Sequence, residues 1–314
     1  MRDTMRRLPQ NEHQSRFWNF SIQAVILASA ILAGCNGSAT GPTAQLGAVT
    51  NLTAFSASAT AIGLSWTSSP DSSSTDLAQY KINAWANSVL QATVYASKTD
   101  RGTVVGNLLG NYVYQLDVTA MAAPGSQKFS NSTTVSIQWA PAKRFVGPYS
   151  LQELASNNGA GSGLVFLDQG TGQPQVRSAA FRAVYQQVLD VILDSTSSGG
   201  LVLRSADLNP LLVGTTPRHT RFSTVVTDSD VLNIGQNQPP ARATYTVDTV
   251  LIDTAPVTIG KIFYAISSDS NYVRILVPQS GGSLFAGAAP NRAVNLQLSY
   301  QLLPNTPFVK RSGN

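Results

Sequence analysis

Side chains able to carry out catalysis are scarce beyond residue 35. In that part of the chain His219 is the single histidine and Glu153 the single glutamate. A Ser-His-Asp triad needs a histidine as general base, so His219 would have to supply it. Arg218 and Arg221 lie close to it in sequence and disfavour an imidazolium ion, and no Gly-x-Ser-x-Gly motif is near. We therefore predict no catalytic residue and no enzymatic activity.

Metal ligands and cofactor motifs are equally few. A zinc site needs about four His, Cys or carboxylate ligands, and a calcium site needs clustered oxygen atoms. The candidate aspartates are two close pairs and one that precedes a Gln-Gly-Thr-Gly stretch: Asp190 with Asp194, Asp228 with Asp230, and Asp168. None forms an EF-hand pattern, and no spacing singles out a glycosidase pair. Turn capping and solvated strand ends explain these residues better, so no metal and no cofactor are predicted.

The single cysteine, Cys35, follows a segment with the parts of a secretory signal. Four arginines precede an apolar run that begins near Phe17: Arg2, Arg6, Arg7 and Arg16. The run ends in Leu32, Ala33 and Gly34, directly before the cysteine. This order resembles the signal peptide (1–34) and lipobox of a bacterial lipoprotein. A retained transmembrane anchor is the alternative interpretation.

The lipoprotein resemblance implies a location and a covalent modification. Cys35 would be the acylated residue, and several acyl chains anchor a protein stably to a membrane. Asn36, rather than Asp, follows the cysteine, which favours the outer membrane over the inner one. The expected location is therefore the cell envelope, with the membrane as a partner through the lipid on Cys35.

Composition indicates two all-β domains behind a flexible tether. Residues 35–47 are rich in Gly, Ser, Ala, Thr and Pro and are predicted to be the tether. The remainder is long enough for two domains of ordinary size. Charged residues make up 12% of the chain and no second cysteine is present, so packed apolar cores rather than disulfides must stabilise it. The dispersed basic residues exclude nucleic-acid binding.

Residues 48–140 are predicted to form the first β-sandwich. Alternating apolar residues indicate short strands over 61–66, 80–84, 113–120 and 133–137. Trp66, Tyr80 and the run from Leu108 to Ala120 around Tyr114 make the region similar to a fibronectin type III domain, with Gly110 where the family usually has Pro. The resemblance implies an immunoglobulin-like sandwich and a tyrosine corner at Tyr114.

That resemblance assigns the aromatic residues to the core. Trp66 and Tyr114 are expected to pack inside the sandwich rather than to bind a ligand, whereas Trp85 is left open between the two roles. Modules of this family mostly space, present or bind, and the fold alone implies no chemistry.

A linker over 141–162 and a second, larger β-sandwich over 163–314 are predicted to follow. Strand-like runs alternate with turns that carry Asp, Ser, Gly and Pro, so a sandwich, with the jelly roll as one form, is expected. Between Phe181 and Ile192 apolar residues recur at helical spacing, but β-branched residues favour a strand in the second half, and the first half stays open. The domain is similar to the C-terminal halves of uncharacterised bacterial surface lipoproteins.

The expected function is a binding, adhesion or scaffolding role at the cell envelope without catalysis. The partner is an envelope protein or a polysaccharide that the sequence does not identify. A carbohydrate-active or glycan-binding second domain is the alternative. Exposed Tyr264, Tyr272 and Tyr300 on one sheet face would favour glycan binding, and two aspartates close together in a cleft would favour hydrolysis. Self-assembly through an exposed sheet edge is the third interpretation.

Overall fold

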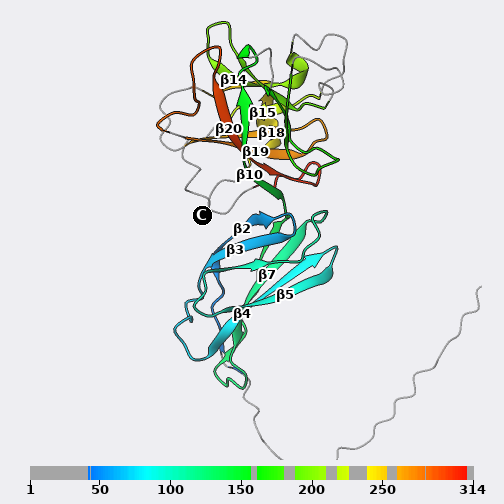
Figure 1. The fold of residues 1–314 in the computed structure, drawn as a ribbon. Coiled ribbons are helices and arrows are strands. Elements are labelled where there is room, and N and C mark those ends of the chain that lie inside the picture. Colours follow the sequence, from blue (N-terminus) through cyan, green and yellow to red (C-terminus); the bar gives the residue numbers. More distant parts are fainter. Residues whose placement is uncertain are drawn as a thin grey trace, which may run out of the picture. The chain divides into compact units, whose positions relative to one another are not determined.

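The computed structural model describes residues 42, 44–156, 161–179, 188–209, 218–225, 239–252, 260–279 and 281–309. Strands are the dominant elements of these ranges, and they form two β-sandwiches in sequence order (Figure 1), which confirms the all-β fold class. The predicted signal peptide 1–34, Cys35 and most of the predicted tether lie outside the described residues. Within the described ranges, no helix has both the length and the apolar character needed to span a bilayer.

The first domain is a sandwich of a three-stranded and a four-stranded sheet. All neighbouring strands in both sheets are antiparallel. The three-stranded sheet has the order β2 (Thr50–Ser58), β3 (Ala61–Thr67), β6 (Gly102–Val105). The four-stranded sheet has the order β5 (Val89–Ser97), β4 (Leu77–Ala86), β7 (Tyr114–Ala122), β9 (Val135–Trp139). This is the fibronectin type III arrangement that residues 48–140 predict.

The predicted core aromatics of this domain lie where the sequence places them. Trp66 is 4% exposed and meets Tyr80 edge to face, with 5.5 Å between ring centroids. The Tyr114 hydroxyl accepts a hydrogen bond from the Leu109 amide (2.8 Å) and donates one to the Leu109 carbonyl (3.2 Å). The tyrosine corner is therefore confirmed, and both Trp66 and Tyr114 are core residues rather than ligand platforms.

The first sandwich begins earlier than the sequence indicates. The short strand β1 (Ala44–Gln45), within the stretch predicted as tether, pairs in parallel with β8 (Phe129–Ser130). Leu46 is buried, and the Gly47 amide donates to an Asp71 carboxylate oxygen at 2.7 Å. Residues 44–47 are small or polar apart from Leu46, so the backbone bonds that hold them leave little trace in the sequence pattern.

The second domain is also a two-sheet sandwich, with antiparallel pairing throughout. The six-stranded sheet has the order β10 (Lys143–Gln152), β20 (Ala293–Tyr300), β19 (Tyr272–Pro278), β18 (Gly260–Ile266), β15 (Arg221–Ser223), β16 (Tyr245–Val247). The five-stranded sheet has the order β12 (Gln175–Arg177), β11 (Gly163–Val165), β13 (Val191–Ser195), β14 (Leu201–Ser205), β17 (Thr249–Leu251). Consecutive strands such as β18, β19 and β20 stay in one sheet, so these connections are meanders.

Apolar residues of both sheets meet in one core, which is the reason the two layers hold together. Phe166 and Leu203 from one side and Phe263 and Ile275 from the other belong to the same buried cluster. Burying a side chain of this size stabilises the fold by about 1.5–3 kcal/mol. The core therefore supplies the stability that disulfides cannot provide in a chain with one cysteine.

The segment predicted as a linker, 141–162, contains the first strand of this domain. β10 pairs with β20 along nearly its whole length, and Phe145 and Leu151 lie in the core. The pairing register shifts between Phe145 and Tyr149, where Gly147 has a φ of +59°. This bulge breaks the apolar alternation, which is why the sequence pattern does not indicate a strand. The ambiguous segment before β13 lies outside the described residues over 180–187.

The three tyrosines whose exposure would favour glycan binding by the second domain are buried. Tyr264, Tyr272 and Tyr300 are only 2–3% exposed. β18 is buried along both faces, and Tyr264 and Tyr272 pack with Tyr245 in a second apolar cluster on the face opposite the main core. Tyr300 of β20 lies in the main core instead. None of the three rings is exposed, so they cannot form a glycan platform.

The tyrosine corner gives a test of the first domain. Replacing Tyr114 with Phe removes the part-buried hydrogen bonds to the Leu109 amide and carbonyl, so we expect the domain to lose about 0.5–1.5 kcal/mol of stability. Urea unfolding followed by tryptophan fluorescence measures the loss. Tyr112→Phe is the matched control, because the Tyr112 hydroxyl bonds to no described residue; equal midpoints for the two variants would contradict a stabilising corner.

Candidate functional site

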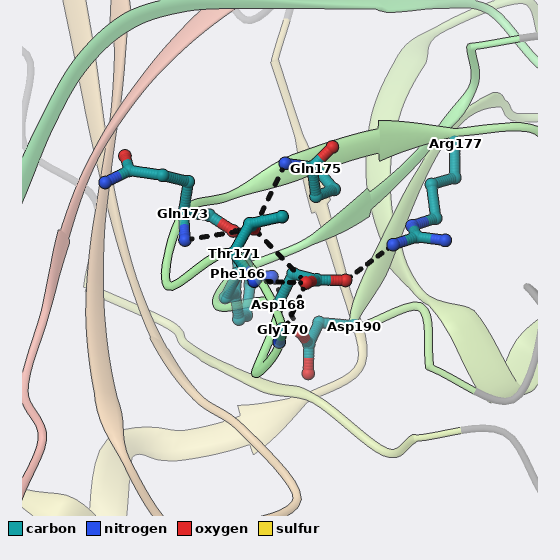
Figure 2. Close-up of polar contacts among 8 residues, drawn as sticks. All are labelled: Phe166, Asp168, Gly170, Thr171, Gln173, Gln175, Arg177 and Asp190. Carbon is teal, nitrogen blue, oxygen red and sulfur yellow. Dashed lines mark hydrogen bonds and ion pairs between the residues drawn. The ribbon is translucent and has the colours of Figure 1, made fainter.

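Asp168, the aspartate that precedes the Gln-Gly-Thr-Gly stretch, caps a turn (Figure 2). One carboxylate oxygen accepts hydrogen bonds from the Gly170 amide (3.0 Å) and the Thr171 amide (2.9 Å). The other oxygen forms an ion pair with Arg177 at 2.5 Å. The Thr171 amide is the main reason that the pKa of Asp168 is lowered. Its lone pairs are thus engaged within the protein, as the turn-capping interpretation predicts.

The predicted pair Asp190 and Asp194 does not act as a pair. Asp194 forms an ion pair with Arg204 at 3.0 Å on the strands β13 and β14. Asp190 is 1% exposed, and its carboxylate accepts the Phe166 amide (2.7 Å) and the Arg218 Nε–H (2.7 Å). Each carboxylate therefore has its own basic partner. Asp228 and Asp230 lie outside the described residues.

Arg218 connects the buried aspartate to the surface. Its Nε pairs with Asp190, and its terminal nitrogen pairs with Asp269 on the loop between β18 and β19. Burial raises the pKa of Asp190 to about 6, and the Arg218 charge opposes that rise. The Asp269 pair fixes the hairpin loop against the segment that carries His219.

His219 is held in one orientation rather than lying on a free loop. Its Nδ1 is 2.6 Å from Asp207, which belongs to the short 3-10 helix η2 (Ala206–Leu208). Its Nε2 accepts the Arg221 Nε–H at 3.2 Å and lies 3.4 Å from Asp248. A histidine that accepts at Nε2 donates from Nδ1, so Asp207 is the acceptor. Among the described residues, no serine hydroxyl bonds to Nε2.

A pocket of about 310 Å³ opens beside this histidine. Three separate segments line it: His219 with the start of β15, the turn η4 (Arg242–Thr244) with β16, and the β18–β19 hairpin. The lining residues are His219, Arg221, Arg242, Tyr245, Ile266, Ser267, Ser268 and Ser270. Tyr245, Ile266 and Ser267 are buried, whereas Arg221 and Arg242 are exposed. None of these lining residues is a carboxylate.

The two arginines of the pocket have no carboxylate partner among the described residues. Arg242 donates to the Asn305 side-chain oxygen at 2.6 Å, and Arg221 donates to His219. The Tyr245 hydroxyl is buried and bonds to nothing in the described ranges. Burial raises the pKa of Tyr245, and its hydroxyl is closed to solvent. Guanidinium and hydroxyl donors around one cavity suit a group with several anionic oxygens.

The sequence pattern gives little sign of this pocket. His219 takes its orientation from Asp207 of η2, and Asp248, between β16 and β17, lies 3.4 Å from its Nε2. The dense Arg-His-Thr-Arg stretch is the single local signal, because the remaining lining residues come from segments distant in sequence.

Glu153, the single glutamate beyond the predicted leader, is structural. Arg292 Nε and Nη2 donate to its two carboxylate oxygens at 2.9 and 2.8 Å, and both side chains are buried. The Arg292 hydrogen bond is the main reason that the pKa of Glu153 is lowered. This two-point ion pair joins the end of β10 to the start of β20. Both oxygen atoms of the Glu153 carboxylate are therefore engaged by Arg292.

Comparisons with known proteins give no functional assignment. No family profile and no curated protein matches the chain. The fn3 domain of the human collagen alpha-1(XX) chain is 21% identical over 35% of this chain and 93% of that chain, with a TM-score of 0.25. Domains d3–d4 of the rat CD45 extracellular region are 14% identical over 42% of this chain and 84% of that chain, with a TM-score of 0.26. The fold of the first domain is therefore assigned from its own strand order and tyrosine corner.

Asp190 gives the site a testable pH dependence. Its pKa is raised from the ordinary 3.8 to about 6 in the folded protein, so the unfolded chain releases this proton at a lower pH than the folded one. Stability from this group is full below pH 4 and falls as pH rises toward 6, by about 1–3 kcal/mol. We therefore compare the unfolding free energies of the wild type and of Asp190→Asn. The wild-type value minus the variant value should fall as the pH is raised from 4 to 6.

Urea midpoints of the two proteins at a series of pH values measure this difference. Asp100→Asn, on an exposed turn of the first domain, serves as the control for general effects of removing a carboxylate. A wild-type minus Asp190→Asn difference that stays flat from pH 4 to 6 would show that Asp190 ionises alike in the folded and unfolded states.

Proposed function

We propose that the protein is a lipid-anchored binding protein of the cell envelope, and that its second domain binds an anionic ligand in the pocket beside His219. The observation that carries the ligand proposal is the pair Arg221 and Arg242. Both line one cavity, and neither pairs with a carboxylate of the described residues.

The pocket favours a small ligand group with oxygen atoms that carry negative charge. Its volume of about 310 Å³ is at the lower end of the range for ligand pockets. Arginine binds carboxylate, sulfate and phosphate groups through paired N–H donors. Ser268 and Ser270 add hydroxyl groups that can bond to the neutral part of the same ligand, whereas the buried Ser267 hydroxyl already accepts the Asn271 amide.

The geometry around His219 supports binding rather than hydrolysis. The Nε2 atom, which acts as the base in a hydrolytic triad, already accepts the Arg221 Nε–H. Asp207 accepts the Nδ1–H of the imidazole, so this carboxylate is engaged in orienting the ring. The histidine therefore positions Arg221 at the mouth of the cavity.

The anchoring part of the proposal is supported by the sequence. The apolar run that ends at Leu32-Ala33-Gly34-Cys35 has the features of a lipobox. The first domain follows the tether in the chain and would serve as a spacer or as a second binding module, in keeping with the general use of its fold.

Titration of the purified chain with glucuronate and with glucose tests the anion proposal. The two sugars share a ring and differ at the carboxylate, so we expect glucuronate to bind and glucose to bind at least about tenfold more weakly. Arg221→Gln and Arg242→Gln should each weaken glucuronate binding by about tenfold, and added salt should weaken it further.

Arg101→Gln is the matched control, because Arg101 is an exposed arginine of the first domain. It removes the same charge without touching the pocket and should leave affinity unchanged. Equal loss in all three variants would assign the effect to net charge, and unchanged affinity in Arg221→Gln and Arg242→Gln would overturn the proposed site.

Cys35→Ser tests the anchor in a bacterial host with a lipoprotein export pathway. The thiol is the acceptor for the lipid, so the variant should lose metabolic labelling by palmitate and should leave the membrane fraction. Replacing Ser38 by Ala, three residues on, leaves the thiol in place and should change neither readout. Labelled Cys35→Ser protein would contradict acylation at this position.

A further inference from the structure

We propose that the solvent face of the four-stranded sheet in the first domain binds an uncharged saccharide, with Trp85 as its platform. A pocket of about 630 Å³ lies on this face. Its lining residues are Trp85, Asn87, Ser88, Val113, Gln115, Asp117 and Gln138. The site is separate from the pocket beside His219 and rests on different observations.

Strand geometry places Trp85 on the solvent side of the sheet. Side chains alternate along a strand, and Tyr80, Ile82 and Ala84 of β4 are all buried in the sandwich core. Trp85 therefore points the other way, and it is half-buried there. Its cross-strand neighbour on β7 is Gln115, whose own neighbour on β9 is Gln138. One aromatic and two amides thus form a row across three strands.

The indole provides the apolar half of the site. A pyranose ring presents a face of C–H groups, and a flat aromatic ring buries that face at little entropic cost. Val113, which is 38% exposed, extends the apolar surface within the same pocket. The polar rim then needs to meet the sugar hydroxyls.

The rim is rich in oriented hydrogen-bond acceptors. Gln115 Nε2 donates to Asp117 Oδ1 at 3.0 Å, and the Ser136 hydroxyl donates to the same oxygen at 2.6 Å. These bonds hold both side chains and leave Gln115 Oε1 and Asp117 Oδ2 bonded to no described residue. Sugar hydroxyls are donors that match these two acceptors. The Trp85 indole contributes its ring face rather than its Nε1–H, because that nitrogen is closed to solvent.

The turn between β4 and β5 fixes one wall of the pocket. Asn87 and Ser88 have φ values of +49° and +63°, which form a two-residue hairpin turn of the type that matches strand twist. A wall built on a tight turn and a platform built on a strand are both set before the ligand binds. Such preorganisation lowers the entropic cost of binding.

Charge separates the ligand of this pocket from that of the pocket beside His219. Asp117 is the single charged residue in the lining of the Trp85 pocket, so an acidic sugar meets repulsion there. The pocket beside His219 carries two arginines instead. An uncharged glycan is therefore the occupant that the aromatic, amide and carboxylate groups favour together.

Titration of the purified full chain with uncharged oligosaccharides tests the proposal. The probes are glucan, chitin and mannan oligosaccharides, followed by calorimetry. We expect at least one of them to bind, and Trp85→Ala to weaken that binding by about tenfold or more, since stacking on the indole is lost. Trp85→Phe keeps an aromatic face and should retain part of the affinity.

Two further variants keep the result interpretable. Gln138 is exposed and its side chain bonds to no described residue, so Gln138→Ala should fold normally and still weaken binding. Tyr95→Ala removes another exposed aromatic of the same domain, 55% exposed and outside the pocket, and should leave binding unchanged. Binding that Trp85→Ala and Gln138→Ala leave intact would overturn the site, as would no binding of any of the three glycan classes.

Discussion

The second domain depends on the position of one guanidinium group. Arg218 lies between Asp190, which is 1% exposed, and Asp269 on the β18–β19 hairpin. Removing a carboxylate from water costs several kcal/mol unless a charge and hydrogen bonds replace the water. Arg218 and the Phe166 amide are those replacements. The requirement to pair Asp190 therefore fixes Arg218, and with it the neighbouring His219 and the hairpin that line the pocket.

The same constraint operates at Glu153 and Arg292. Two hydrogen bonds join these buried side chains and close the end of β10 onto the start of β20. A buried ion pair contributes little net stability, but losing one partner costs about 3–5 kcal/mol. In a sandwich without disulfides, such pairs select one register and one loop arrangement, and the apolar core supplies the stability.

The first domain could be predicted from the sequence because its determinants are local. Trp66, Tyr80 and Tyr114 stand in short runs of alternation, and alternation sets which side chain faces the core. The second domain could be predicted only in outline. At β10 the bulge at Gly147 breaks the apolar alternation that would indicate a strand. At β18 both faces are buried, and the residue types, including Tyr264, do not reveal whether one face or both are covered.

The pocket beside His219 could not be predicted at all, for a topological reason. Its lining comes from three segments that are adjacent only because β15 pairs with both β16 and β18. No residue in it is unusual alone, and His219 acquires its orientation from Asp207 of the 3-10 helix η2 and from Arg221. A site that is assembled by the order of strands in a sheet contains no local sequence motif. Its residues can be grouped only once the strand order is known.

The two proposed pockets differ in the charge of their linings. Specificity is a difference between affinities, and repulsion of the wrong ligand contributes to it as much as attraction of the right one. Arg221 and Arg242 line the proposed pocket of the second domain, whereas Asp117 is the charged residue in the lining of the proposed pocket of the first, so the proposals imply opposite preferences for an acidic ligand. A polymer with both acidic and uncharged residues could engage both domains, and the second contact would then form at the high effective concentration that a shared chain provides. Weak binding at each pocket would in that case be compatible with firm attachment to the polymer.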